Sequence, residues 1–423
     1  MKQSALVALL ASLFLFACGE DDPMPTPDTD QVEDVDQVED VDQVEEVDQV
    51  EEVDQVEEVD QVEQDELPPP PATERVIVFG DSLSDIGTYM PVTSLTGNGQ
   101  APFFGGKFTT NSFSGYTPEN NQSTSMTWGE LVALELSLMI TPHEVGIGTQ
   151  SVKCPAAASP ELANTCTGYA QGGSRVSDPK GVANPEGTGL INGQPTVFTR
   201  PLVTQVADHL TRFSAFEDTD LVFVWGGNND AFANFEAVGD AVLTPEQAIT
   251  AMQTAATELA TLVRDQILAN GASRVMVLTL PDSSYTPAFA NAPAEHKALL
   301  SQLIVAFNQT LKAALEGADV EIMEMDAVFV DLFSNPGSYG LSNVSETVCD
   351  PTRISLLTQG AETNGSSLFC NMSAGQPFFG LRDGANPETW LFADGVHPST
   401  GGHAVLAEVL IDQLRTLEWI PAE

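Results

Sequence analysis

The chain has 423 residues, of which 61 are acidic and 15 are basic, giving a formal net charge of -46 at pH 7. Residues 1–72 hold 23 of the acids and one base, so the remainder is still acidic. Binding to nucleic-acid phosphates needs clustered Lys and Arg, and this balance therefore excludes a nucleic-acid-binding protein. After residue 18 no apolar run is long enough to cross a bilayer, which argues against an integral membrane protein.

The first 17 residues have the layout of a secretory signal peptide, with Lys2 ahead of an apolar stretch that ends at Ala17. The sequence Leu-Phe-Ala-Cys resembles a bacterial lipobox, in which Cys18 is the residue that is acylated. We therefore expect a lipoprotein anchored at the bacterial cell envelope. Gly19 favours the outer membrane, with the protein on its periplasmic or surface face. The alternative is an ordinary signal peptide and a secreted protein.

Residues 18–72 are predicted to be a disordered tether. A six-residue unit, Asp-Gln-Val-Glu-Asp/Glu-Val, occurs five times from Asp30, and a partial copy starts at Asp60. Valine at every third position is too sparse to bury a core, and the acids repel one another. A calcium-binding repeat is the alternative, although the unit lacks the Gly-rich turns of β-roll repeats. The prolines at 68–71 stiffen the entrance to the folded part.

From residue 73 onward, strand patterns alternate with helix patterns. Short apolar runs rich in β-branched residues predict strands at 75–79, 221–225, 274–280 and 320–325. Helical patterns lie at 126–138, 203–213, 246–269, 295–316 and 403–414. This alternation predicts one α/β domain over 73–423, a three-layer α/β/α sandwich with a mostly parallel sheet. Ligands of such sheets bind at the carboxyl ends of the strands.

Four cysteines lie in the predicted domain: Cys154, Cys166, Cys349 and Cys370. Four cysteines allow three connectivities, and the sequence alone does not decide between them. We expect the pairs closest in the chain, 154 with 166 and 349 with 370, because each pair brackets a loop-like stretch rich in small residues. A zinc site is the alternative, but no Cys-x-x-Cys motif or adjacent His supports it.

Two polar motifs at opposite ends of the domain predict a serine hydrolase. The first strand runs into Gly80-Asp81-Ser82, where a serine on a tight turn can present its hydroxyl at the sheet edge. Asp394 and His397 stand three residues apart on a turn, so the carboxylate can orient the imidazole. The other imidazole nitrogen can then accept a proton from Ser82. These residues are the candidate nucleophile, general base and orienting acid.

Four blocks in chain order carry a family resemblance: 80–85, 169–173, 227–230 and 394–397. Together they resemble the four blocks of the GDSL, or SGNH, hydrolases, which have a flavodoxin-like α/β/α fold. The nucleophile does not stand in a Gly-x-Ser-x-Gly elbow, so the common α/β-hydrolase fold is disfavoured. The resemblance implies that no metal and no cofactor is required.

The resemblance also implies an oxyanion hole, made by the backbone N–H groups of Ser82 and Gly173 and by the side-chain amide of Asn229. In the second block Gly172 competes with Gly173, and in the third Asn228 competes with Asn229. The family spacing Gly-x-Asn-Asp favours Asn229. Similar proteins often carry Ala or Ser in the first of the two glycine positions, which favours Gly173.

Finer similarities point to a bacterial esterase or lipase branch close to the lecithinase/haemolysin-like members. They lie at 108–111, at 280–282 with 286–287, and at Trp128 with Leu131. A pairing of Cys349 with Cys370 would also resemble a disulfide loop ahead of the catalytic Asp in some members. No function is predicted for His403, for which helix capping or packing is the ordinary role.

The sequence thus predicts a monomeric serine esterase or lipase that hydrolyses carboxylic acyl esters through an acyl-enzyme. Its activity should rise through about pH 6–8, because the base must be neutral. A phospholipase or acyltransferase acting on lipids and an O-acetyl esterase acting on polysaccharide are alternatives within this chemistry. A surface binding module that has lost catalysis is the alternative from another class.

Overall fold

The structure is a computed structural model. It describes residues 72–90, 105–112, 123–146, 151–182, 189–191, 194–196, 199–358, 360, 362–373 and 379–422. The predicted signal peptide, the lipid anchor at Cys18 and the acidic repeat lie outside these residues, so they stay predictions.

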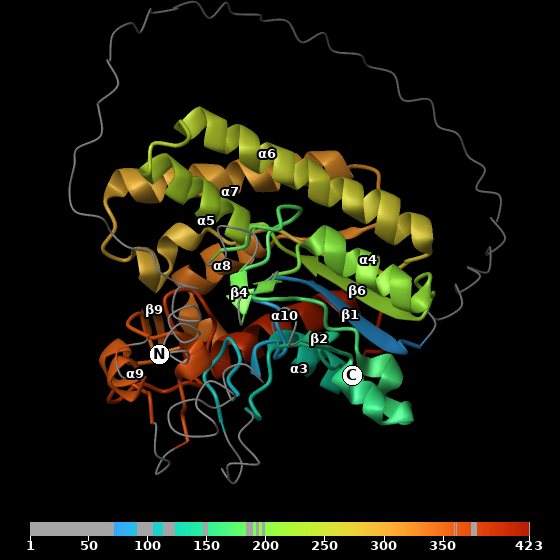
Figure 1. The fold of residues 1–423 in the computed structure, drawn as a ribbon, viewed down its shortest axis with the longest axis horizontal. Helices are drawn as coiled ribbons and strands as arrows, with labels where there is room; N and C mark the ends of the chain where they lie inside the picture. The colour runs from blue at the N-terminus through green and yellow to red at the C-terminus, as the bar shows by residue number, and fades with distance from the viewer. Residues whose placement is uncertain are drawn as a thin grey trace, which may run out of the picture. The chain divides into compact units, whose positions relative to one another are not determined.

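The centre of the fold is a parallel sheet (Figure 1). Its neighbouring strands, in spatial order, are β1 (Arg75–Gly80), β6 (Asp220–Trp225), β7 (Val275–Leu278) and β8 (Glu321–Met323). On the other side of β1, residues 167–171 run parallel to it: Val78 N donates to Thr167 O, and Tyr169 N donates to Val78 O. With that segment included, the spatial order is 2-1-3-4-5, which is the order of the flavodoxin-like folds that the family resemblance implied.

Helices cover both faces of this sheet (Figure 1). One face carries α4 (Leu202–Phe213), α5 (Asn228–Gly239), α6 (Pro245–Leu262) and α7 (Ala294–Leu315). The other face carries α3 (Trp128–Glu135) and α10 (Thr400–Thr416), which contact each other. The predicted three-layer α/β/α sandwich is therefore confirmed.

Shorter elements surround this frame. They are β2 (Glu144–Val145), β3 (Val152–Lys153), β4 (Gly189–Ile191), β5 (Gln194–Thr196), α8 (Met325–Ser334), β9 (Asn343–Thr347), α9 (Pro351–Leu357) and β10 (Trp390–Phe392). The helices α5, α8 and α9 were not expected from the sequence. α8 and α9 are shorter than the predicted helices, and α5 starts with three buried polar residues, so hydrophobic periodicity did not mark it.

Each predicted run contains a strand, because a strand covered on both faces is apolar throughout. The runs at 274–280 and 320–325 are strands only over Val275–Leu278 and Glu321–Met323, and Met325 already begins α8. Every residue of β6 is buried, and β1 is buried from Val76 onward. The long helix expected at 246–269 keeps its α-helical form only to Leu262. It continues as a π-helical turn (Val263–Ile267) and a 3-10 turn (Leu268–Asn270).

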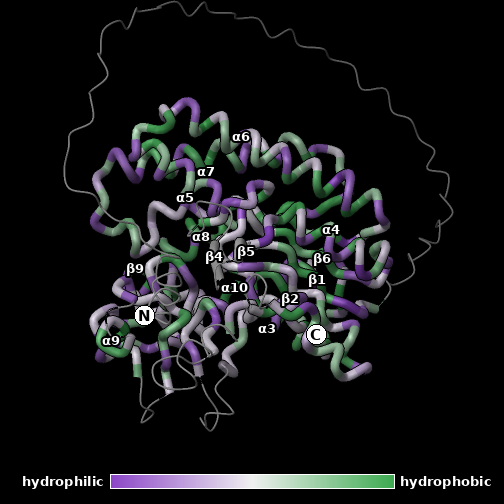
Figure 2. Tube along the Cα trace, viewed as in Figure 1, coloured by the Kyte–Doolittle hydropathy of each residue, from purple (hydrophilic) through white to green (hydrophobic). Residues whose placement is uncertain are grey.

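Hydrophobic residues gather on the sheet and on the helix faces that meet it, while the outer helix faces are more hydrophilic (Figure 2). A second core lies apart from this main core. Its members are Tyr89, Phe108, Val348, Cys349, Ile354, Leu368, Phe369, Cys370, Leu381 and Ala393. We call this group the second core.

Two disulfides join the described cysteines. Cys154 pairs with Cys166 and Cys349 pairs with Cys370, which is the connectivity expected from the sequence. These four thiols are therefore not available as zinc ligands. The second disulfide lies in the second core, where it ties the chain after β9 to the segment before Asn371.

The helix α7 has the length and apolar composition of a membrane span. Those two properties alone are weak evidence, because the core helix of a globular domain has them too. Leu300, Leu303 and Phe307 of α7 are fully buried in the main core, which accounts for the composition of the helix.

Candidate active site

The turn that carries Ser82 follows directly from the end of β1. A Cβ at Gly80 would collide with the backbone oxygen of Trp225 on the neighbouring strand, so glycine is required there. The side chain of Gln205 on α4 holds this residue from both sides. Its Oε1 accepts from Gly80 N at 2.9 Å, and its Nε2 donates to Gly80 O at 2.8 Å. Ser82 thus lies at the carboxyl edge of the sheet on a fixed turn.

The buried carboxylate of Asp85 joins the first block to the second. One oxygen accepts from Gly87 N at 2.8 Å and Thr88 N at 2.7 Å, and the other accepts from Gly172 N at 3.0 Å. Burial raises the pKa of this carboxyl, and the three hydrogen bonds oppose that shift. Because Gly172 N–H is used by Asp85, it is not available to an oxyanion. The N–H of Gly173, at φ 82°, has no acceptor within the described residues.

The third block links β6 to α5 and is tied to the second block. Asp230 accepts from the Nε of Arg175 and from the N–H of Val176, each at 3.0 Å. Asn229 Nδ2 donates to Ser174 O at 2.9 Å, next to Gly173. An amide nitrogen carries two hydrogens, so this bond leaves a second one for a ligand.

Asn228, the competitor of Asn229, has a different partner. Its Oδ1 accepts from Ser283 Oγ at 3.3 Å, on the loop that follows β7. Within the described residues, its Nδ2 is buried without a hydrogen-bond acceptor. The structure therefore connects Asn229, and not Asn228, to the loop that carries the candidate oxyanion glycine.

Asp394 and His397 form a direct pair after β10. His397 Nδ1 lies 2.8 Å from one carboxylate oxygen of Asp394 and 2.9 Å from the other. The carboxylate also accepts from Ser367 N at 2.7 Å. Burial opposes ionisation of Asp394, but the charge of His397 and these hydrogen bonds outweigh it and lower its pKa to about 2. The carboxylate is therefore charged at neutral pH and can orient a neutral imidazole and stabilise a protonated one.

The carboxyl of Asp81, next to Ser82 in the first block, is buried. This carboxyl is 1% exposed and, within the part of the chain that the structure describes, accepts only from Leu83 N, at 3.0 Å. Within the described residues its Oδ2 has no hydrogen-bond donor. Burial raises its pKa to about 7, while the charge of His397 acts in the opposite direction.

A cavity of about 470 Å³ lies beside the fourth block. It is lined by Pro287, Ala288, Ser345, Glu346, Thr347, Pro351, Thr363, Asn364, Ser366, Arg382, Asp394, Gly395 and Val396. A larger groove of about 740 Å³ runs along α4 and α6, and its lining includes no residue of the four blocks. The smaller cavity borders Asp394, and its lining includes none of Ser82, Gly173, Asn229 and His397.

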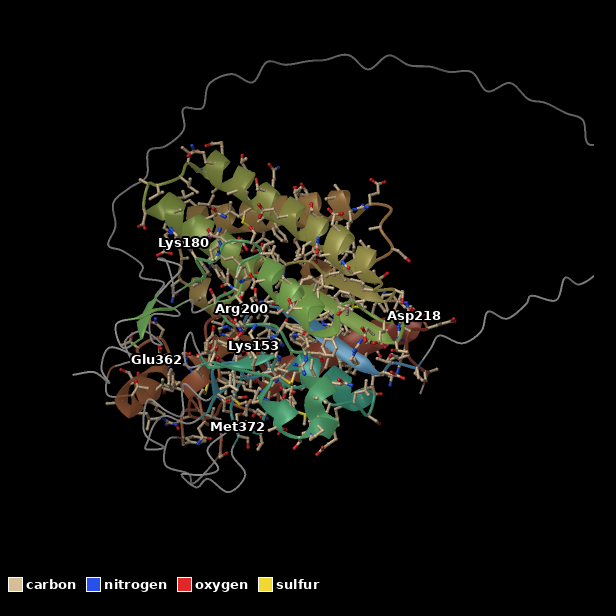
Figure 3. All side chains as sticks on the ribbon, turned by 45° about the vertical axis from the view of Figure 1, so that its right-hand side comes forward. Lys153, Lys180, Arg200, Asp218, Glu362 and Met372 are labelled. Atoms are coloured by element: carbon tan, nitrogen blue, oxygen red, sulfur yellow. A yellow bond between two sulfur atoms is a disulfide. The ribbon has the colours of Figure 1, made fainter. Side chains whose placement is uncertain are left out.

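Glu362 precedes two residues that line this cavity, Thr363 and Asn364. In Figure 3 it lies on the opposite side of the molecule from Asp218, which stands just before β6. This is consistent with a site at the carboxyl edge of the sheet, because Asp218 marks the edge where β6 begins. Within the described ranges, no three His, Cys, Asp or Glu side chains gather in a group that could hold a metal ion.

Several residues that hold the site were not identified from the sequence. Gln205 and Ser367 carry no motif, and their bonds to Gly80 and Asp394 span 125 and 27 residues. Asp85 and Asp230 lie inside the blocks, but no role was predicted for them. The signal that could have found them is that an Asp inside a glycine-rich turn often accepts backbone N–H groups.

Comparison with known proteins gives one family model. Residues 76–410 match GDSL-like Lipase/Acylhydrolase. A phosphatidylcholine-sterol acyltransferase of Aeromonas hydrophila is 24% identical over 370 residues, which cover 80% of this chain and 89% of that protein. The Esterase EstA of Pseudomonas aeruginosa is 27% identical over 336 residues, which cover 79% of this chain and 45% of that protein.

Most of the curated relatives are longer than the matched region: the chain spans 33–47% of their length. Among solved structures, a phospholipase A1 from Streptomyces albidoflavus NA297 aligns over 81% of this chain and 99% of that chain. Its sequence identity is 13% and its TM-score is 0.32.

Proposed function

We propose, from the premise that the chain belongs to the GDSL-like lipase/acylhydrolase family, that it is a serine esterase or lipase acting on carboxylic esters. The observation that carries this proposal is the Asp394–His397 pair, whose carboxylate stays ionised down to a pH of about 2. A carboxylate held in this way can orient His397 as the general base that the proposed mechanism assigns to Ser82.

In the proposed mechanism, Ser82 Oγ attacks the acyl carbon while His397 accepts the hydroxyl proton. The charge that develops on the carbonyl oxygen is stabilised by the N–H groups of Ser82 and Gly173 and by Asn229 Nδ2. His397 then gives its proton to the leaving alcohol. Water attacks the acyl-enzyme with His397 again as base, releasing the acid and regenerating Ser82.

Two substrate classes remain candidates. Esters of lipids are favoured by the names of the relatives, which include a phosphatidylcholine-sterol acyltransferase. Acetylated polysaccharide is the second candidate, and the lining of the cavity beside Asp394 supports it. Ser345, Thr347 and Asn364 are among the polar side chains of that lining, and hydroxyl and amide groups suit a polar alcohol.

We also propose that lipid on Cys18 anchors the protein to the cell envelope. The support is the lipobox-like sequence that ends at this residue. The test is fractionation of cells that express the wild-type chain or Cys18→Ser. The anchor predicts that the wild type stays with the membrane fraction and the variant leaves it, whereas equal distribution of both would contradict it.

The test of the enzymatic proposal is hydrolysis of p-nitrophenyl esters from acetate to palmitate, with Ser82→Ala measured in parallel. The variant should lose at least about 10⁴-fold in kcat, because the nucleophile is removed. A preference for long acyl chains supports the lipase, and turnover of acetate alone supports the O-acetyl esterase. A folded Ser82→Ala that retains wild-type turnover would contradict the mechanism.

A further inference from the structure

His403, on α10, is fully buried and both of its ring nitrogens are used. Its Nδ1 lies 3.2 Å from the N–H of Trp128, the first residue of α3, and must accept that hydrogen. The proton of the neutral ring is then on Nε2, which donates to Phe108 O at 3.1 Å. Burial lowers the pKa of His403 to about 4; the hydrogen bond to Phe108 O opposes this shift, and the charge of Lys107 adds to it. The ring is therefore neutral and held in one tautomer.

Phe108, whose backbone oxygen accepts the hydrogen bond from His403, contacts the candidate base His397. The centroid of the Phe108 ring lies 4.8 Å from that of the His397 imidazole, with 34° between the planes. Phe108 also meets Tyr89 edge to face, and the hydroxyl of Tyr89 donates to Gly172 O at 2.7 Å. A Cβ at Gly172 would collide with the Phe108 ring. Phe108 thus packs between the imidazole and the oxyanion loop.

The short segment that contains Phe108 also reaches Asp394, the candidate acid, through Ser367. Asn111 Nδ2 donates to Ser367 O at 2.7 Å, and Ser367 N donates to the carboxylate of Asp394 at 2.7 Å. Asn111 Oδ1 accepts from Lys107 N at 2.8 Å, which closes the segment on itself. We call residues 107–111 the strap. It touches His397 through one side chain and supports Asp394 through another.

We propose that His403 is a positioning residue for ester hydrolysis, acting on the imidazole of His397 through Phe108. The proposal rests on the proposed function, because it assumes that His397 is the base. His403 fixes the backbone oxygen of Phe108, and the ring of that residue limits the tilt of the imidazole. A displacement of about 1 Å in a catalytic group can cost about 10²-fold in rate, so a fault in this support should lower kcat.

Two substitutions of His403, by Gln and by Asn, distinguish a positioning role of its Nε2–H from a role in packing alone. The amide nitrogen of Gln reaches the Nε2 position of histidine, so His403→Gln can still donate to Phe108 O. The amide of Asn ends at the Nδ1 position, so His403→Asn cannot. We expect His403→Asn to lose about 10–100-fold in kcat on a p-nitrophenyl ester with KM changed less than about threefold. His403→Gln should recover most of that loss.

The matched control is His209→Gln. His209 is also fully buried with its pKa lowered to about 4 by burial, but it lies on α4, packed on Phe216 and bonded to the hydroxyl of Tyr169. This variant should lose stability and keep its kcat. If it loses kcat as strongly as His403→Asn, the effect is general destabilisation and the proposal is wrong.

Other outcomes are equally decisive. The proposal is overturned if folded His403→Asn keeps wild-type kcat, or if His403→Gln is no better than His403→Asn. If His403→Asn does not fold, Phe108→Leu takes its place: it removes the ring beside His397 and should lower kcat in the same way, and an unchanged kcat would overturn the proposal. Failure of the proposed function itself is separate, because it would appear as activity retained by Ser82→Ala.

Discussion

The two halves of the candidate site are held by different parts of the molecule. Ser82, Gly173 and Asn229 follow the sheet edge, and buried carboxylates and Gln205 tie their loops to the main core. Asp394 and His397 instead lie against the second core, supported by the strap and by the loop that the Cys349–Cys370 disulfide closes. The candidate nucleophile and oxyanion donors are thus held mainly at the end of the sheet, although Tyr89 and Phe108 of the second core also contact the oxyanion loop. The candidate acid–base pair depends on cross-links between loops.

The largest effect should come from breaking the acid–base pair. Asp394→Asn is expected to lower kcat by about 10⁴-fold, because an amide stabilises the wrong imidazole tautomer and cannot balance the imidazolium. Ester hydrolysis under saturating substrate measures it. Asp383→Asn is the control, since this exposed carboxylate belongs to the same half but pairs only with Arg353 among the described residues. A loss below about tenfold in Asp394→Asn would remove this pair from the mechanism.

The half of the candidate site at the sheet edge, which holds Ser82, Gly173 and Asn229, is tested by removing the candidate oxyanion donor Asn229. Asn229→Ala should lower kcat by about 10²–10³-fold, the usual cost of removing one such donor. Asn228→Ala should cost much less, because its side chain is bonded to Ser283 and not to the oxyanion loop. Parallel kinetics of the two variants decide the assignment. A larger loss in Asn228→Ala would exchange their roles.

The two disulfides are expected to contribute similarly to stability but differently to catalysis. Replacing either pair with serines should cost about 3 kcal/mol of unfolding free energy, because loops of 12 and 21 residues are released in the unfolded chain. Only loss of Cys349–Cys370 should also lower kcat, since that bond belongs to the second core. Urea unfolding and ester hydrolysis measure the two effects. Equal kcat in the two variants would contradict the difference between the halves.

The smallest effect concerns Glu362, a buried acid in the half of the candidate site that holds Asp394 and His397. Burial raises the pKa of Glu362 to about 7, so from pH 4.5 to 7 the folded protein keeps a proton that the unfolded chain has lost. Stability contributed by the protonated form is therefore lost as pH rises through that window. Glu362→Gln should raise the unfolding free energy at pH 8 by about 1–3 kcal/mol and have little effect at pH 4. Denaturation at the two pH values measures it, and an equal effect at both would contradict the raised pKa.

Much of the sheet-edge half could be predicted from the sequence, because its signals are local. Apolar runs mark β1 and β6, and each ends in a polar, glycine-containing turn within a few residues. The pairing of Asp394 with His397 was also visible, since three residues on a turn bring the side chains together. The family resemblance added the oxyanion donors.

The supports of these residues could not be predicted in the same way. His403 was expected only to cap or pack its helix, yet it joins Trp128 to Phe108 across 275 and 295 residues. Asn111 was noted only as part of a family-like segment, and its bond to Ser367 spans 256 residues. Hydrophobic periodicity reports neighbours within a few positions, so contacts over such separations leave no pattern in a single sequence.

The sequence by itself determined the layer architecture, the order of the four blocks and the candidate nucleophile, base and acid, because strand ends and short turns are local features. Only the tertiary structure decided which cysteines pair. It also decided that the carboxylate of Asp85 accepts from Gly172 N–H, which leaves the N–H of Gly173 for an oxyanion. In the same way it decided that the strap supports the candidate acid–base pair. These outcomes depend on which backbone groups and side chains meet when distant segments pack, and that is fixed by the whole fold.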